Sequence, residues 1–273
     1  MSLPAFEYRR PARLEEALAI LASDPDARPL AGGQTLIPAL KQRLQRPSML
    51  VDLQAIPEML GVEVTPTHVT IGAMTRHAVT AWDERVSAAI PALSHLARGI
   101  AHSQVRHLGT MGGSIANNDP AADYPAALVG LGATVETSRR AIPADEFFLG
   151  LFTTALDPGE LILRIRFPIP ARAGYHKFAN IASGYVTTGA FVSEGPAGLR
   201  VAVNGAAACV FRQNEAETRL ATDFSPAALD GFAQPEADLN NDLHATAAYR
   251  AQLTAVAIRR ALAMAIGQST ETP

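Results

Sequence analysis

The chain has 273 residues, enough to bury a large core in one large or two modest domains. Its formal net charge of −3 and the lack of a basic run exclude an electrostatic case for nucleic-acid binding. The single cysteine, Cys209, excludes an internal disulfide, a four-cysteine iron–sulfur cluster and a thiolate zinc site within this chain. The N-terminus does not suit a signal peptide and apolar runs such as 126–135 are too short to span a bilayer, so we expect a soluble, cytoplasmic protein.

The first part of the chain has a β–α–β pattern. Residues 12–22 carry apolar side chains at helical spacing, and the segment ending at Leu30 is typical of a strand. Pro38 suits the first turn of the next helix, which is expected to direct Leu44 inward. Residues 49–53 predict the following strand. No Gly-x-Gly-x-x-Gly or Gly-x4-Gly-Lys-Ser/Thr motif accompanies them, which counts against NAD-type and P-loop sites.

From Gly61 the pattern changes to alternating strands and short helices. Alternation around Val69 and Ile71 predicts a half-buried strand, and Thr75 is a plausible N-cap for a helix through Trp82. The remaining elements expected here are helices after Pro91, from Pro125 and from Pro143, and strands at 134–137 and 161–167, the last with Arg164 and Arg166 on its outer side.

Residues 168–174 form a Pro- and Gly-containing stretch that is the candidate domain boundary. Three strands are expected after it, at about 175–182, 187–193 and 199–211, and the Asn204-Gly205 pair is a hairpin signal that can split the last one. A tail helix follows, with Tyr249, Leu253 and Val256 expected on one face. Strands followed by helices indicate an α+β domain.

Two glycine-rich loops stand out as candidates for a ligand site. Residues 109–123 read Gly-Thr-Met-Gly-Gly-Ser-Ile-Ala-Asn-Asn-Asp-Pro-Ala-Ala-Asp, and residues 30–38 read Leu-Ala-Gly-Gly-Gln-Thr-Leu-Ile-Pro. Glycine permits left-handed backbone and close approach of a ligand, and concave arrays of backbone N–H groups bind phosphates. One such loop alone is typical of a tight turn. The pair indicates two walls of one site for a phosphate-bearing cofactor.

Other chemical candidates have competing interpretations. Asp119 and Asp123 could form an acid–base pair, stabilise turns, or bind a ribityl or ribose hydroxyl. The histidines show no metal-ligand spacing, and Ser114 has no evident base. Cys209 is interpreted as a small core residue in an apolar strand. Lys177 and Tyr185 are either a strand edge with a surface aromatic or part of a site.

These motifs, with Gly72 to His77, Glu160 to Ile162 and Tyr249-Arg250, span nearly the whole chain. In that order they resemble the FAD-binding medium subunits of molybdenum hydroxylases, and most closely the aerobic carbon monoxide dehydrogenase group of the xanthine dehydrogenase family. The resemblance implies an α+β fold. A two-lobed PCMH-type FAD-binding domain would occupy 1–170, with lobes at about 1–55 and 56–170. A carbon monoxide dehydrogenase flavoprotein-like domain at 175–273 would hold a three-stranded antiparallel sheet with helices.

The resemblance also implies roles for individual residues. The two loops would cradle the FAD pyrophosphate, Asp123 would bind a flavin hydroxyl, and Leu161 would lie near the adenine. The cofactor-binding residues implied in this way are Ala31, Gly32, Gly33, Gln34, Thr35, Leu36, Ala101, Gly109, Thr110, Gly112, Gly113, Ser114, Ala116, Asp123, Leu161, Lys177 and Tyr185.

The family's Lys…Tyr element keeps its spacing here as Lys177 and Tyr185, which would place Tyr185 against the flavin ring. The family often has Arg and Asp between these two residues. This chain has Asn180 or Ile181 and Gly184 there instead.

The function implied by the resemblance is electron transfer in a multi-subunit oxidoreductase. In such enzymes substrate is oxidised at a molybdenum cofactor on a large subunit. Electrons then pass through two [2Fe–2S] clusters on a small subunit to FAD and to an external acceptor. This chain would be the FAD subunit in a dimer of heterotrimers, with no catalytic or metal-binding residue of its own. The substrate stays open, as does the acceptor: NAD, quinone, cytochrome or oxygen.

Two alternative functions remain. A stand-alone PCMH-type flavin oxidoreductase, such as a reductase of the enolpyruvyl-glucosamine kind, would need a general acid near flavin N5, and the sequence offers no convincing one. A flavin-free scaffold would have no use for two intact glycine loops.

Overall fold

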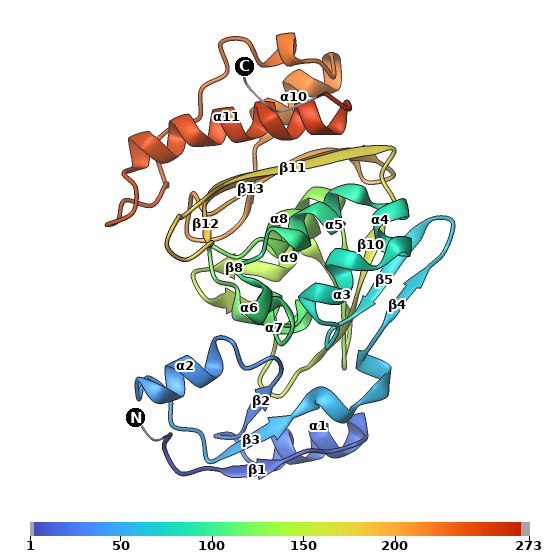
Figure 1. Ribbon diagram of the computed structural model, residues 1–273, viewed down its shortest axis with the longest axis vertical. Coiled ribbons are helices and arrows are strands. Elements are labelled where there is room, and N and C mark those ends of the chain that lie inside the picture. The colour runs from blue at the N-terminus through green and yellow to red at the C-terminus, as the bar shows by residue number, and fades with distance from the viewer. Residues whose placement is uncertain (1–2, 269–273) are drawn as a thin grey trace.

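The computed structural model describes residues 3–268, which form three parts stacked along the long axis of the molecule (Figure 1). The first part is a parallel sheet in the order β1 (Glu7–Arg9), β3 (Met49–Asp52), β2 (Arg28–Leu30), with helices α1 (Leu14–Ser23) and α2 (Leu36–Lys41) between its strands along the chain. The predicted β–α–β start is therefore confirmed. Leu44, however, does not point inward. Helix α2 ends at Lys41 and Leu44 lies in the following turn with 73% of its surface exposed.

The second part is an antiparallel sheet in the order β4, β5, β10, β6, β7, with helices packed on one face. The strands are β4 (Val62–Val64), β5 (His68–Gly72), β6 (Thr134–Thr137), β7 (Ala141–Pro143) and β10 (Ile162–Pro168). The helices are α3 (His77–Trp82), α4 (Glu84–Ala89), α5 (Pro91–Arg98), α6 (Ser103–Arg106), α7 (Met111–Asn117), α8 (Tyr124–Leu131) and α9 (Ala144–Phe147), and β8 (Phe148–Gly150) with β9 (Thr153–Thr154) form a hairpin.

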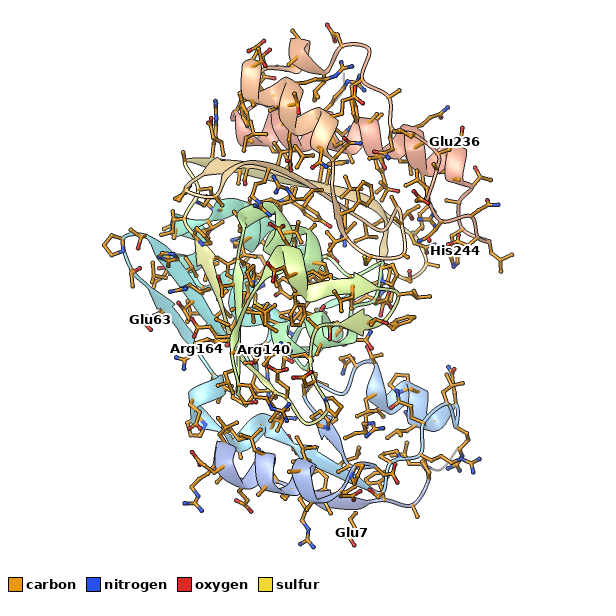
Figure 2. The ribbon with its side chains drawn as sticks, turned by 180° about the vertical axis from the view of Figure 1, so that it is seen from behind. Glu7, Glu63, Arg140, Arg164, Glu236 and His244 are labelled. Carbon is orange, nitrogen blue, oxygen red and sulfur yellow. The ribbon has the colours of Figure 1, made fainter. Side chains whose placement is uncertain are left out.

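Strand β10 alternates as the sequence predicts. Ile165 and Phe167 are fully buried, whereas Arg164 and Arg166 lie on the other face and pair with Glu136. Figure 2 shows Arg164 in the middle of the molecule, with Glu7 at the opposite end from Glu236 and His244.

Thr75 is not the N-cap of a helix, contrary to expectation. Helix α3 begins at His77, and its N-cap is Arg76, which makes no side-chain capping bond. The Thr75 hydroxyl instead donates to the carbonyl oxygen of Gly61 and accepts a hydrogen bond from its N–H, both at 3.0 Å. These long-range bonds compete with local capping and fasten the end of β5 to the start of β4.

The third part is a sheet of four antiparallel strands, not the expected three: β11 (Arg172–Ala179), β12 (Val186–Gly195), β13 (Gly198–Asn204) and β14 (Phe211–Arg212). Strand β13 ends at Asn204 because Gly205 takes a left-handed conformation with φ of +78°. The chain then returns, and Phe211 pairs with Val203. Cys209 consequently lies half-buried in the returning loop rather than in a strand.

Helices α10 (Asn214–Thr222) and α11 (Ala247–Ala265) follow the sheet, and α11 packs on β11 and β12 while α8 packs on β12 and β13. The buried face of α11 includes Leu253 and Leu262, but Tyr249 and Val256, expected on that face, are 51% and 37% exposed. The core residues of this helix include Ala257, Ile258 and Ala261, so its buried face is rotated about the helix axis from the predicted stripe.

One apolar core runs through all three parts, from Val51 through Ile71 and Phe147 to Phe191. A second core lies between the third sheet and α11. Within residues 3–268, no helix has both the length and the apolar character needed to cross a lipid bilayer. A cleft lies between the first two parts of the molecule, and Gly184 and Tyr185 of the third part also line it.

Candidate functional site

The cleft has a volume of about 400 Å³ and is lined by both glycine loops. It collects every residue predicted to bind a cofactor except Lys177: Ala31, Gly32, Gly33, Gln34, Thr35, Leu36, Ala101, Gly109, Thr110, Gly112, Gly113, Ser114, Ala116, Asp123, Leu161 and Tyr185. Segments far apart in the sequence therefore meet around one cavity.

The first loop presents an array of free backbone donors. It joins the end of β2 to the start of α2, and Gly33 has a φ of +70°, which favours glycine. In the part of the chain that the structure describes, the N–H groups of residues 32–36 have no hydrogen-bond acceptor. Consecutive free N–H groups at the start of a helix form a site for an anion.

The composition of the second loop suggests free backbone N–H groups like those of the first loop, but several of them are hydrogen-bonded within the protein. Its Met111 N–H donates to Thr75 and its Gly112 N–H to Ala73, while the Gly113 N–H donates to the Thr110 hydroxyl at 3.2 Å. The second loop is thus fastened to the end of β5. Its glycines serve close packing instead, because a Cβ on Gly112 would lie 2.6 Å from the Cβ of Ala73.

Asp123 forms a buried polar cluster at the base of α8. Its side chain is 4% exposed, and Oδ1 accepts a hydrogen bond from the Tyr175 hydroxyl at 2.9 Å and forms an ion pair with Lys177 Nζ at 2.8 Å. Burial raises the pKa of Asp123, and the Lys177 ammonium opposes that rise. Asp119, by contrast, stabilises a turn, since its Oδ1 accepts a hydrogen bond from Ala121 N–H at 2.9 Å. Asp119 and Asp123 share no hydrogen-bond or ion-pair partner among the described residues, so they do not form an acid–base pair.

Tyr185 lies at the rim of the cleft with 46% of its surface exposed. It follows a turn in which the Asn180 side chain accepts hydrogen bonds from the N–H groups of Ala182 and Ser183. Asn180 therefore shapes the turn before Tyr185. Lys177 lies outside the cleft on β11.

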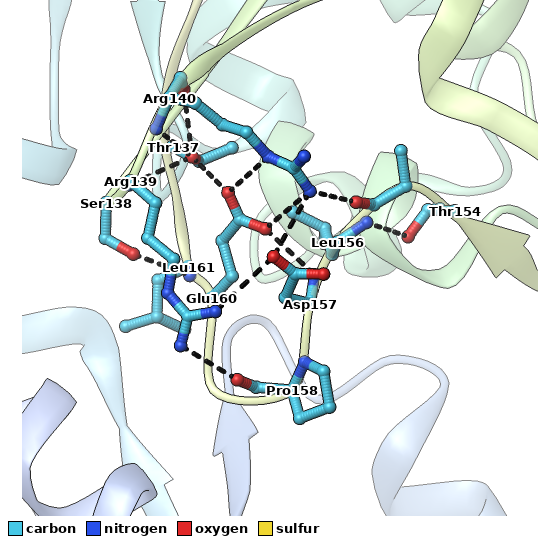
Figure 3. Close-up of polar contacts among 11 residues, drawn as sticks. Thr137, Ser138, Arg139, Arg140, Thr154, Leu156, Asp157, Pro158, Glu160 and Leu161 are labelled. Atoms are coloured by element: carbon cyan, nitrogen blue, oxygen red, sulfur yellow. Dashed lines mark hydrogen bonds and ion pairs between the residues drawn. The ribbon is translucent and has the colours of Figure 1, made fainter.

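Glu160 and Leu161 belong to a loop held by a dense polar network (Figure 3). The Glu160 side chain is fully buried and accepts hydrogen bonds from the Thr137 hydroxyl at 2.5 Å, from Asp157 N–H at 2.8 Å and from the Arg140 guanidinium at 3.3 Å. Burial alone raises the pKa of Glu160, but these bonds together hold it below its ordinary value. The network fixes the loop whose Leu156 and Leu161 line the cleft.

Several cleft residues are not among the predicted site residues. His77 and Met74 belong to the recognised motif at 72–77 but have no predicted role in a site. His77 is 5% exposed, its ring lies 5.2 Å from that of Tyr124, and burial lowers its pKa to about 4. Arg28 and Ile100 also line the cleft, and no local signal indicates them. Among residues 3–268, no group of three or more His, Cys, Asp or Glu side chains could hold a metal ion.

Comparison with known proteins identifies the family. Residues 4–170 match the family described as the FAD binding domain in molybdopterin dehydrogenase. The chain belongs to this family. It is 33% identical over 280 residues to the nicotine 6-hydroxylase medium subunit of Paenarthrobacter nicotinovorans, covering 96% of this chain and 98% of that one.

Carbon monoxide dehydrogenases give similar matches. The medium chain of Hydrogenophaga pseudoflava is 33% identical over 280 residues, covering 95% of this chain and 96% of that one. A chain of the reconstituted CO dehydrogenase from Oligotropha carboxidovorans superposes with a TM-score of 0.90 at 34% identity, over 98% of this chain and 100% of that one. The protein is therefore an FAD-binding medium subunit of the molybdopterin dehydrogenase family, similar to CO dehydrogenase medium chains, and its α+β fold matches theirs.

The cleft of this medium subunit fits FAD. The free N–H groups of residues 32–36 suit the pyrophosphate, and Met74, Ile100 and Leu156 provide apolar walls for flat rings. Its volume falls in the range of roughly 300–1,000 Å³ that is usual for small-molecule sites.

Proposed function

We propose that the cleft holds one non-covalent FAD, through which this subunit passes electrons from two [2Fe–2S] clusters of a small partner subunit to an external acceptor. The observation that carries the proposal is the row of free N–H groups at residues 32–36 on the cleft wall. When bound, FAD supplies the chemistry that matches one-electron clusters to a two-electron acceptor.

Different residues of the cleft bind different parts of FAD. The first loop holds the pyrophosphate, with the hydroxyl groups of Thr110 and Ser114 opposite it. Leu161 contacts the adenine, and Asp123 binds a flavin hydroxyl. The half-exposed Tyr185 covers the flavin ring at the rim, where an acceptor approaches from solvent.

The remaining cofactors belong to partners in this proposal. Cys209 is the only cysteine, so the chain cannot supply thiolates for the clusters. A small iron–sulfur subunit would hold them and a large subunit would hold the molybdenum cofactor, in a dimer of heterotrimers. We further propose that residues 1–170, in lobes of about 1–55 and 56–170, form the FAD domain, and that 175–273 form the second domain. The cytoplasmic location stays a prediction.

Purification of the complex from its native source through a tag on this chain tests the proposal. We expect two further subunits to co-purify, with iron, molybdenum and FAD in the ratio of two [2Fe–2S] clusters and one molybdenum cofactor per FAD. If the chain purifies alone with FAD and turns over a substrate without partners, it is a stand-alone flavin oxidoreductase and the proposal is wrong.

A further inference from the structure

Lys177 lies outside the cleft but contacts three segments that form its wall. Its Nζ lies 2.8 Å from the carbonyl oxygen of Gly99, 3.1 Å from that of Gly184 and 2.8 Å from Oδ1 of Asp123. Two of these contacts are hydrogen bonds and the third is an ion pair, so the ammonium group is surrounded by acceptors of the protein itself.

Two of these segments carry cleft residues in unusual backbone conformations. Gly184, directly before Tyr185, has a φ of +72°, and Ala101, two residues after Gly99, has a φ of +41°. The segments touch, since a Cβ on Gly184 would lie 3.3 Å from the Cα of Ala101. A non-glycine residue at positive φ persists only where surrounding contacts hold it.

Two cationic side chains, Arg106 and Lys177, hydrogen-bond to backbone carbonyl groups of this wall. Arg106 donates to the carbonyl oxygens of Ile100 at 2.7 Å and Ala101 at 2.9 Å, on the same segment whose Gly99 carbonyl accepts from Lys177. Within residues 3–268, Arg106 makes no hydrogen bond or ion pair with residues 184–185. Of Arg106 and Lys177, only Lys177 joins the 99–101 segment to residues 184–185 and to the buried Asp123.

We propose that Lys177 is a positioning residue: it clamps the 99–101 and 184–185 segments together and thereby fixes Tyr185 against the flavin ring, without touching the flavin. This inference rests on the proposed place of FAD in the cleft. Lys177 then affects the surroundings of the flavin ring, whereas the first loop determines the affinity for the pyrophosphate.

A double-mutant cycle of Lys177→Met with Tyr185→Ala tests the clamp in the full chain loaded with FAD. The readouts are the visible circular dichroism of the bound flavin and the rate of air reoxidation after photoreduction. We expect Lys177→Met to change the reoxidation rate by at least about threefold, and to add little to the change already made by Tyr185→Ala, because coupled residues are non-additive. Lys177→Arg, which keeps the charge and several donors, should recover most of the wild-type signal.

The outcomes separate this inference from the function it rests on. If wild type takes up no FAD, the proposed function fails. If wild type binds FAD and Lys177→Met leaves both readouts unchanged, or changes them equally in the Tyr185→Ala background, the clamp is wrong while the function stands. Lys177→Gln retains two donors and is measured in the same cycle, so that the test holds if Lys177→Met does not fold.

Discussion

Gly32 of the first loop packs directly against Leu108, the residue before the second loop. A Cβ on residue 32 would collide with the carbonyl oxygen of Leu108 and lie 2.6 Å from the Cα of Gly109. Both obstacles are backbone atoms, which cannot rotate away as a side chain can. Glycine at position 32 is therefore needed for the two loops to meet, whereas glycine at position 33 serves the conformation that exposes the free N–H groups.

We predict that Gly33→Val abolishes tight FAD binding while the chain stays folded. Valine tolerates the φ of +70° at this position poorly, so the loop must shift and its N–H groups no longer converge. Gly231→Val is the matched control, because Gly231 has a φ of +71° in open space away from the cleft. Flavin fluorescence titration should show a loss for the first variant only. Equal affinities in both variants would remove the first loop from the site.

We predict that Tyr185→Ala alters flavin reactivity more than flavin retention. One aromatic contact contributes roughly 0.5–1.5 kcal/mol beyond its area burial, which corresponds to about a tenfold change in affinity. Its removal uncovers the flavin ring, so the reduction potential and the rate of reoxidation should change. Tyr249→Ala, at a residue of similar exposure on α11, is the control. Identical potentials and reoxidation rates in wild type and Tyr185→Ala would show that Tyr185 does not cover the ring.

We predict that Glu160→Gln weakens FAD binding but leaves FMN binding unchanged. The variant removes the charge that holds the loop carrying Leu161, and only FAD has an adenine to contact there. The lost charged hydrogen bonds should cost roughly 1–3 kcal/mol of stability. Glu194→Gln, in an exposed pair with Arg172, should change neither measurement. Isothermal titration with both flavins and thermal unfolding test this, and parallel losses for FAD and FMN would contradict the adenine assignment.

We predict that His77 makes the protein less stable as the pH falls from about 6.5 to about 4. Its folded pKa is lowered to about 4 by burial, with help from Arg106, while the unfolded chain titrates near 6.5. Between these values the unfolded state binds more protons, so the free energy of unfolding falls by up to roughly 3 kcal/mol. Urea unfolding across this range should show a shallower dependence for His77→Gln. The exposed His102→Gln is the control, and parallel curves for wild type and His77→Gln would contradict the prediction.

The cleft can be predicted from sequence because its glycines are visible there. Gly33 acts within its own turn, whereas Gly32 packs against the distant Leu108, and in both cases the glycine itself is the signal. The partners of Asp123 leave none. Tyr175 and Lys177 come from β11, and nothing in the 109–123 segment indicates that they reach its carboxylate.

The misplaced elements share one cause, which is tertiary contact overriding a local pattern. Thr75 has the right residue type for a cap, but its hydroxyl bonds to Gly61. Strand β14 has two residues, too few for a periodic signal, and exists only because Phe211 returns to pair with Val203. On α11 the sheet decides which face is buried, and it leaves Tyr249 exposed.

The central claim is that the cleft is built around the pyrophosphate and adenine half of FAD. The most direct measurement is a calorimetric titration of the flavin-free full chain with FAD and, separately, with FMN. Our account predicts one FAD per chain, released intact on denaturation, and FMN binding at least about tenfold weaker because FMN lacks the groups that the first loop and Leu161 contact. No uptake of FAD, or equal affinity for FAD and FMN, would contradict it.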